Sequence, residues 1–310
     1  MKVIIAGLGV QGHKRRRFAG ADYVAAVDPV NPAADYRALA DVPLDRYDAV
    51  LACVPDEPKL ELLSYLVANG KHVLVEKPLW TSADDDIRRL ETEARAKGVV
   101  VYTAYNHRFE PHNVRMRDLI ASGALGTIYS CRMFYGNGTA LLVRESAWRD
   151  QGAGVLPDLG SHLLDTCRFW FGDLLVATED TFHLVAASCF ENRAPDHVVI
   201  ASEATRPRIE LEMTLCMWRN HFTCDILAEK GSAHIENLCK WGPTTFTHRT
   251  RMLPSGRPRE EAATLVEEDP TWALEYAHFK RLCRERAPTD LGSDLWLQAT
   301  LRRLGGEAGA

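Results

Sequence analysis

Short runs of apolar, β-branched residues alternate with amphipathic segments through the first third of the chain. Five of these runs have the length and composition of buried strands: 2–7, 23–28, 48–54, 71–76 and 99–105. Helical periodicity covers 58–69 and 82–97 between them. Because strands and helices alternate, the pattern predicts βαβ units and a parallel sheet in this part of the chain.

The pattern changes after about residue 120 to an alternation of apolar and polar positions. In "IELEMTLCMW", 209–218, apolar side chains take every second position, which predicts a strand with one covered face. Similar segments from 128 to 250 predict a predominantly antiparallel, open sheet. A helical pattern at 158–171 lies within this half, and two further helical segments close the chain.

Length and pattern together predict two domains. A single hydrophobic core stops growing at roughly 250–300 residues, and the chain has 310. We therefore expect an α/β protein in which 1–110 form a domain with a parallel sheet. Residues 111–310 are expected to form an α+β domain with a predominantly antiparallel, open sheet.

Charge and cysteine usage exclude several classes of protein. The formal net charge is −5 and the pI is about 6.1, which argues against binding nucleic acid by bulk electrostatics. The eight cysteines form no C-x-x-C pair and lie singly in apolar runs such as "MTLCMW". Such cysteines are typical of reduced, buried thiols and not of a disulfide framework or a zinc site.

No apolar run approaches the roughly 18 residues of a membrane span. The glycines near the N-terminus and the basic run "HKRRR" at 13–17 argue against a signal peptide. We therefore expect a cytoplasmic protein without membrane partners.

Three glycines after the first predicted strand form the spacing G-x-G-x-x-G: Gly7, Gly9 and Gly12. The spacing alone is a weak signal, but here it follows a strand and opens a predicted helix. In that context the first glycine allows a tight turn, the second lets the backbone approach a pyrophosphate, and the third lets helix and strand pack closely. The helix N-terminus, with Val10 and Gln11, then offers N–H groups to the phosphates.

Asp28 ends the second predicted strand, about 20 residues after the glycines. A carboxylate there accepts hydrogen bonds from both ribose hydroxyls, which favours NAD over NADP. The alternative is that Asp28 simply starts a turn with Pro29. We expect Lys14 to Arg17 close to the adenosine end, where they would tolerate a 2′-phosphate, so NADP stays open.

Two polar motifs follow predicted parallel strands. Glu76-Lys77-Pro78 lies at the carboxyl edge of the sheet, where ligands bind in open α/β sheets, and an ammonium there polarises a substrate oxygen. A surface ion pair is the alternative. In "YNHRFEP", 105–111, we expect Asn106, His107 and Arg108 beside the nicotinamide or the substrate. The alternative is a loop in which Arg108 is solvated.

The stretch "GVLPDLGSHLLD", 154–165, places Asp158 and His162 four positions apart, on one face of a predicted helix. Three interpretations are open: a capped helix end, a metal site, or the acid–base part of an active site. An imidazole is the side chain best suited to take a hydroxyl proton near neutral pH. A metal site that also used Asp165 would leave the glycine motif unexplained, so we expect no metal.

In combination these motifs resemble the Gfo/Idh/MocA oxidoreductases, the group of glucose–fructose oxidoreductase and inositol dehydrogenase. The resemblance covers nearly the whole chain and includes "SGALGTI" and "GAGVLPDLGSHLLD". It implies a Rossmann domain that holds the dinucleotide and an α+β domain that covers the substrate. By motif, the family's catalytic lysine, aspartate and histidine fall on Lys77, Asp158 and His162. The segment "VPDEPKLE" departs from the Asn-x-x-His pattern of many members.

The resemblance implies an NAD(P)-dependent oxidoreductase. It would transfer a hydride between nicotinamide C4 and a secondary alcohol or ketone carbon of a sugar, sugar derivative or cyclitol. The expected cofactor residues are Gly7, Gly9, Val10, Gln11, Gly12, Asp28, Val54, Pro55, Glu76, Lys77, Asn106 and Arg108. The expected substrate residues are Lys77, His107, Trp148, Arg149, Asp158 and His162.

Two other functions stay open: a catalytically silent dinucleotide-binding regulator on the same fold, and a reductase of a non-sugar ketone or imine. A homodimer or homotetramer through the open sheet is also expected. Cys216 and Trp218 fall on the polar side of the alternation at 209–218, which suggests that this face is covered by another subunit.

Overall fold

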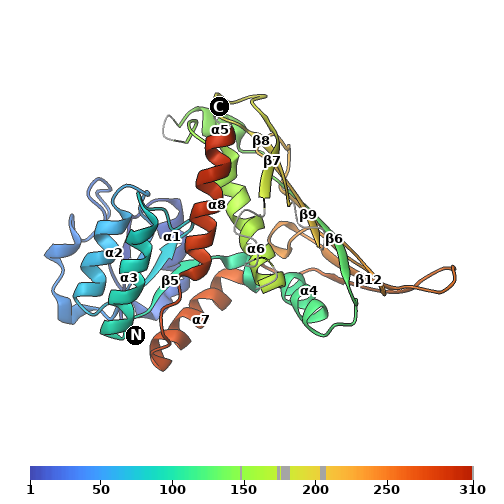
Figure 1. The fold of residues 1–310 in the computed structure, drawn as a ribbon. Helices are drawn as coiled ribbons and strands as arrows, with labels where there is room; N and C mark the ends of the chain where they lie inside the picture. Colours follow the sequence, from blue (N-terminus) through green and yellow to red (C-terminus); the bar gives the residue numbers. More distant parts are fainter. Residues whose placement is uncertain (147–148, 173–174, 176–181, 203–206, 309–310) are drawn as a thin grey trace. The chain divides into compact units, whose positions relative to one another are not determined.

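The computed structural model describes residues 1–146, 149–172, 175, 182–202 and 207–308. The chain divides into two compact units (Figure 1). The first consists of Met1–Asn106 and Thr271–Gln298, and the second of His107–Pro270 and Ala299–Ala310. Each unit contains its own sheet, so an α/β unit and an α+β unit are confirmed.

The first unit contains a five-stranded parallel sheet in the order β2-β1-β3-β4-β5. The strands are β1 Val3–Ala6, β2 Tyr23–Val27, β3 Ala49–Ala52, β4 His72–Glu76 and β5 Val101–Ala104. All five correspond to predicted apolar runs. The strand order reverses between β1 and β3, so the glycine loop after β1 lies at the switch point where such sheets bind ligands.

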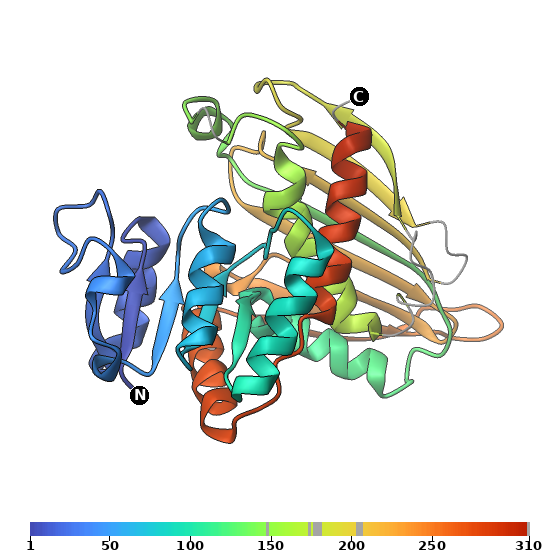
Figure 2. The same cartoon turned by 60° about the vertical axis from the view of Figure 1, so that its left-hand side comes forward.

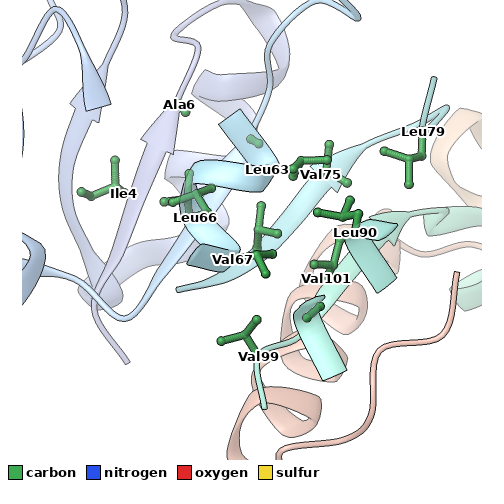
Figure 3. Packing of buried hydrophobic residues seen from close by; sticks show 14 of the residues in the cluster. Ile4, Ala6, Leu63, Leu66, Val67, Val75, Leu79, Leu90, Val99 and Val101 are labelled. Atoms are coloured by element: carbon green, nitrogen blue, oxygen red, sulfur yellow. The ribbon is translucent and has the colours of Figure 1, made fainter. Parts of the chain in front are cut away.

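Helices cover both faces of this sheet, because alternate strand residues point to opposite sides. The helices are α1 Val10–Ala19, α2 Lys59–Ala68, α3 Asp84–Lys97 and α7 Thr271–Glu285. Figure 3 shows one core, in which Ile4 and Val75 from the strands pack with Leu66 and Leu90 from α2 and α3. The second core lies on the α1 and α7 face.

That second core places α7 in the first unit, although the sequence pattern groups 271–298 with the second domain. Tyr276 and Phe279 of α7 are buried with Val3 and Ile5 of β1. The apolar stripe of α7 predicts that the helix is half-buried, but periodicity does not say which of two sheets a helix covers.

The second unit contains an eight-stranded sheet in the order β13-β12-β11-β10-β6-β9-β8-β7 (Figure 2). The strands are β6 Ile128–Gly136, β7 Phe182–Ser188, β8 His197–Ser202, β9 Arg208–Thr214, β10 His221–Ala228, β11 Gly231–Glu236, β12 Thr244–Thr250 and β13 Arg259–Leu265. Neighbouring strands are antiparallel except β6 and β9, which are parallel. The predicted, predominantly antiparallel sheet is confirmed.

Short helices connect and cover these strands. They are α4 Pro111–Ala121, α5 Ala140–Arg144, the π-helical turn η5 Leu156–Gly160 and α6 Ser161–Phe171. The helix α8, Gly292–Ala308, begins in the first unit and ends in the second. Short 3-10 turns are η1 Gly20–Asp22, η2 Leu39–Asp41, η3 Leu44–Arg46, η4 Asn106–Phe109 and η7 Cys239–Trp241. Figures 1 and 2 both show α6 lying against one face of the large sheet.

The other face of the large sheet is polar. Arg132 of β6 pairs with Glu210 of β9 across it. The strand β9 ends at Thr214, so Cys216 and Trp218 lie in the connection beyond it, and the alternation does not place them on this face. The predicted position of Cys216 and Trp218 on this face is wrong, because an apolar alternation can continue past the last paired residue of a strand.

Among the described residues, no helix is long and apolar enough to cross a membrane.

Candidate functional site

The glycine loop combines two tightly packed positions with one open position. A Cβ on Gly7, whose φ is +87°, would lie 2.4 Å from the Cys53 oxygen. A Cβ on Gly12 would lie 2.0 Å from the Gly7 oxygen, whereas nothing lies within 4 Å of a Cβ on Gly9. The first and third glycines are therefore required by packing, and the second leaves room for a ligand to approach the backbone.

Gly9 is also the N-cap of α1, and the first helical hydrogen bond runs from the His13 N–H to its carbonyl at 3.0 Å. The preceding N–H groups, those of Val10, Gln11 and Gly12, have no acceptor within the helix. No acidic side chain lies in this first turn. The residues present thus fit a pyrophosphate.

Asp28 follows β2 at the same sheet edge. Its Oδ2 accepts the Leu8 N–H at 2.8 Å, and its Oδ1 accepts the N–H groups of Val30 and Asn31 at 2.9 and 2.8 Å. Burial acts to raise the pKa of Asp28, but these backbone hydrogen bonds outweigh it and lower the pKa. Asp28 therefore starts a turn, as the alternative interpretation of this residue predicts. It also places a fixed negative charge beside the glycine loop.

The carboxyl edge of the sheet collects further expected cofactor residues. Val54 and Pro55 follow β3, and Glu76 ends β4. Nε of Arg15 donates to Oε1 of Glu76 at 2.6 Å, and its Nη1 donates to Oε2 of Glu275 at 2.6 Å. Arg15 is therefore buried and paired, unlike the solvated helix face that a basic run usually forms.

Lys77 follows Glu76, and its peptide bond to Pro78 is cis. Lys59, a buried lysine of α2, contacts the main chain on both sides of Lys77. Its Nζ donates to the main-chain oxygens of Glu76 and Pro78 at 3.1 and 2.7 Å, and to Oδ1 of Asp56 at 2.5 Å. An ammonium has three donors, and here all three have acceptors.

Sequence reasoning missed Lys59. The available signal was the departure "VPDEPKLE", in which Asp56 lies three positions before Lys59, close enough for the two side chains to pair.

The boundary between the two units falls within the motif "YNHRFEP" after β5, between Asn106 and His107. Asn106 donates from Nδ2 to Oγ1 of Thr271 at 2.8 Å in the first unit. Arg108, in the second, binds both carboxylate oxygens of Asp165 through Nε, at 3.1 and 3.0 Å. Burial raises the pKa of Asp165, and Arg108 opposes this.

Because Asp165 is paired with Arg108, it does not fit the role of a metal ligand. Within the described ranges, no group of three His, Cys, Asp or Glu side chains is placed to hold a metal ion.

Asp158 and His162 lie on consecutive turns. Asp158 belongs to the π-helical turn η5 before α6, and the N-cap residues of η5 and α6 are Val155 and Gly160. Nη2 of Arg149 lies 3.3 Å from Oδ2 of Asp158, which joins an expected substrate residue to an expected catalytic one. His162 is 9% exposed, and its ring stacks on that of His107 with centroids 4.1 Å apart. Trp148 lies outside the described residues.

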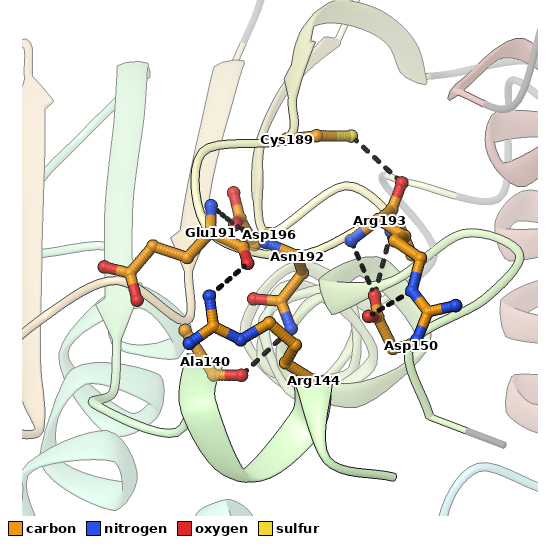
Figure 4. Close-up of polar contacts among 9 residues, drawn as sticks. Ala140, Arg144, Asp150, Cys189, Glu191, Asn192, Arg193 and Asp196 are labelled. Carbon is orange, nitrogen blue, oxygen red and sulfur yellow. Dashed lines mark hydrogen bonds and ion pairs between the residues drawn. The ribbon is translucent and has the colours of Figure 1, made fainter. Parts of the chain in front are cut away.

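A loop between β7 and β8 anchors the chain that leads into this turn (Figure 4). Oδ1 of Asp150 accepts the N–H groups of Arg193 and Ala194 at 2.8 and 3.0 Å. The Val155 N–H donates to the Pro195 oxygen at 2.8 Å, and a Cβ on Gly154 would lie 1.9 Å from that oxygen. This close backbone packing explains why position 154 is a glycine.

The structure therefore brings the predicted residues together in two groups. The glycine loop, Asp28 and Lys77 belong to the first unit, and His107, Asp158 and His162 belong to the second.

Two family models match the chain. One, described as "Oxidoreductase family, NAD-binding Rossmann fold", matches residues 5–105. The other, described as "GFO/IDH/MocA C-terminal domain", matches residues 113–234. Together they cover more than half of the chain and correspond to its two units.

Named relatives are similar over most of the chain. Inositol 2-dehydrogenase 3 of Saccharopolyspora erythraea is 24% identical over 79% of this chain and 70% of its own length. Trans-1,2-dihydrobenzene-1,2-diol dehydrogenase of Bos taurus is 33% identical over 73% of this chain, which spans 66% of that enzyme. A solved levoglucosan dehydrogenase in complex with NADH has a TM-score of 0.80 at 18% identity, over 99% of this chain and 96% of that one, which shows a shared fold.

Proposed function

Because the chain belongs to the Gfo/Idh/MocA family of NAD-binding oxidoreductases, we propose that it oxidises a secondary alcohol of a sugar, sugar derivative or cyclitol, or reduces the corresponding ketone. One observation carries the proposal. The glycine loop, Asp28 and Lys77 lie at one carboxyl edge of a parallel sheet, with open space above Gly9. That edge therefore has both a place for a dinucleotide and a cation for a reacting oxygen.

NAD, when bound, supplies the hydride acceptor at nicotinamide C4. In the oxidation direction, the imidazole of His162 takes the hydroxyl proton as the C–H bond breaks. The ammonium of Lys77 stabilises the negative charge that develops on the oxygen. Asp158, held by Arg149, orients a neighbouring substrate hydroxyl. His107 lines the same part of the second unit.

NAD is the proposed cofactor in preference to NADP. The carboxylate of Asp28 is fixed by three backbone N–H groups and is ionised at neutral pH. A fixed negative charge at this position favours two ribose hydroxyls and repels a 2′-phosphate. Calorimetric titration of both dinucleotides tests this: NAD should bind at least about tenfold more tightly than NADP, and equal affinity would contradict the assignment.

We also propose that the protein associates through the polar face of the large sheet and resides in the cytoplasm. Tyr129 and Leu227 are 38% and 55% exposed on β6 and β10. None of the eight cysteines forms a disulfide, as expected in a reducing compartment. Light scattering should show a dimer or tetramer, and a monomer at all concentrations would contradict the association.

The activity is tested by following NADH formation with a panel of sugars, sugar acids and cyclitols. Turnover of at least one of these, with NAD as oxidant, is expected. Tight NAD binding with no turnover across the panel would contradict the proposal and favour a regulatory dinucleotide-binding protein. Turnover restricted to non-sugar ketones or imines would contradict the substrate class alone.

A further inference from the structure

A lysine outside all the predicted motifs lies beside the stacked imidazoles of the second unit. Nζ of Lys240 is 2.8 Å from Nε2 of His107. Lys240 is the middle residue of η7, the turn between β11 and β12. It is separated from His107 by more than a hundred residues of sequence, so no local pattern predicts the contact.

Buried groups on both sides hold this contact in place. Glu110 is fully buried, and its carboxylate accepts the Cys239 N–H at 2.7 Å and the Cys239 thiol at 3.0 Å. On the other side, Nδ2 of Asn113 donates to the main-chain oxygen of His107 at 3.0 Å. The turn that carries Lys240 and the backbone that carries His107 are therefore both fixed.

Aromatic rings complete the surroundings of the ammonium. Nζ of Lys240 lies 4.5 Å from the ring centroid of Trp241 and 5.8 Å from that of Tyr135. The Tyr135 ring in turn lies 5.5 Å from the His107 ring. Rings of this kind attract a cation through their faces, so they favour the charged form of the lysine at this position.

The chemistry of the two partners fixes the direction of the hydrogen bond. An ammonium has donors and no acceptor. Nε2 of His107 must therefore accept, and an imidazole that accepts at Nε2 carries its single proton on Nδ1. Protonation of Nε2 would remove the acceptor and place two positive charges face to face. Lys240 thus selects the neutral form of His107 and one of its two tautomers.

The protonation state of His107 affects that of His162, because the two rings are stacked. The two rings are 4.1 Å apart at their centroids with an angle of 21° between their planes, so two imidazolium ions would repel strongly. Among the described residues, the charged and titratable groups near this stack include Tyr135, the buried Glu110, the pair of Asp158 with Arg149 and the pair of Asp165 with Arg108. Asp158 and Asp165 each have a guanidinium partner, and Lys240 is the cation that contacts the Nε2 atom of His107.

We propose that Lys240 is a positioning residue: by donating to Nε2 of His107 it keeps that imidazole neutral and leaves His162 as the proton acceptor of the stacked pair. The inference rests on the proposed function, in which His162 takes the hydroxyl proton of the substrate.

The test uses the full-length protein labelled with ¹⁵N-histidine, and the variants Lys240→Met and Lys240→Arg. Long-range ¹H–¹⁵N spectra report which ring nitrogen carries the proton, and His107→Asn assigns the resonances. In the wild type we expect His107 to have an unprotonated Nε2 between about pH 6 and 8. In Lys240→Met the His107 signals should change to the other tautomer or begin to titrate, while Lys240→Arg keeps the wild-type spectrum.

Kinetics provide the second readout. Lys240→Met removes a positive charge beside the stack, so protonation of the pair becomes easier and the acidic limb of kcat/KM should move to higher pH. We expect kcat/KM to fall about tenfold at the acidic end and to stay within about threefold of wild type at the alkaline end. A purely structural role would lower kcat/KM equally at every pH.

The outcomes separate this inference from the proposed function. A proton on Nε2 of His107 in the wild type overturns the Lys240 assignment, whether or not any variant folds. An unchanged tautomer in a folded Lys240→Met protein overturns it as well, even if polyols are turned over. A tautomer change in a protein that turns over no polyol supports the Lys240 assignment and contradicts the proposed function.

Discussion

Nζ of Lys59 donates a hydrogen bond to the main-chain oxygen of Pro78 at 2.7 Å, immediately after the proposed catalytic lysine. The same ammonium donates to the Glu76 oxygen on the other side of Lys77. A buried cation therefore holds both ends of a three-residue segment. The position of Lys77 depends on α2 as well as on the strand that precedes it.

Replacing Lys59 by methionine should lower the turnover number about tenfold, because the segment that carries Lys77 loses its support. The loss of hydrogen bonds from a charged donor should also reduce the free energy of unfolding by about 2 kcal/mol. Steady-state kinetics and urea denaturation measure the two effects.

Lys71→Met is the matched control. Lys71 also donates to two main-chain oxygens of the first unit, those of Leu44 and Tyr47, at 2.6 and 2.8 Å. Its replacement should lower stability by about 1 kcal/mol and leave turnover unchanged. Equal turnover in the two variants would show that Lys59 has no specific effect on Lys77.

Gly9 and Gly12 should respond differently to alanine. In Gly9→Ala the new Cβ meets no atom within 4 Å, so stability should change by less than about 0.5 kcal/mol. Its Cβ should nevertheless occupy the space needed by a pyrophosphate and weaken NAD binding at least about tenfold.

Gly12→Ala places a Cβ 2.0 Å from the Gly7 oxygen and should cost about 3 kcal/mol of stability. Thermal unfolding and NAD titration of both variants test the contrast. Unaltered NAD affinity in Gly9→Ala would contradict the proposed phosphate position.

Stability should decrease as the pH falls below about 6.5, in part because of His72. The Val100 N–H donates to Nδ1 of His72 at 2.9 Å, and burial lowers the pKa of this imidazole below its usual 6.5. Above pH 6.5 the ring is neutral in both states, and its contribution is fully present. Below that pH the unfolded chain binds a proton first, so the folded state loses stability.

His72→Gln isolates this effect, because the glutamine oxygen can accept the Val100 N–H without titrating. Urea denaturation near neutral pH and at about pH 5.5 should show a larger loss of unfolding free energy in the wild type than in His72→Gln. An equal loss in both would rule out a contribution from His72.

The sequence predicts the strands of the first unit and the motifs at their ends because both are local. A buried parallel strand is a continuous apolar run, and Gly7, Gly9 and Gly12 follow the first run directly. The alternation near β9 likewise predicts the covered face of the second sheet. It fails only past Thr214, where the pattern continues but pairing stops.

The parts that could not be predicted are contacts between distant residues. The unit to which α7 belongs depends on Tyr276 and Phe279 meeting β1, and periodicity does not identify that partner. Arg108 looks like a solvated loop residue until Asp165 is seen to bind it. Lys240 has no motif at all, and only the folded sheet brings it to His107.

The central claim is that Lys77 and His162 carry out the chemistry of an NAD-dependent alcohol oxidation. The most direct measurement is the turnover number of Lys77→Ala and His162→Ala at saturating NAD and polyol, with NAD affinity determined on the same samples. Both variants should fold, bind NAD as the wild type does, and lose at least about 100-fold in turnover. Near-normal turnover in both variants would contradict the account.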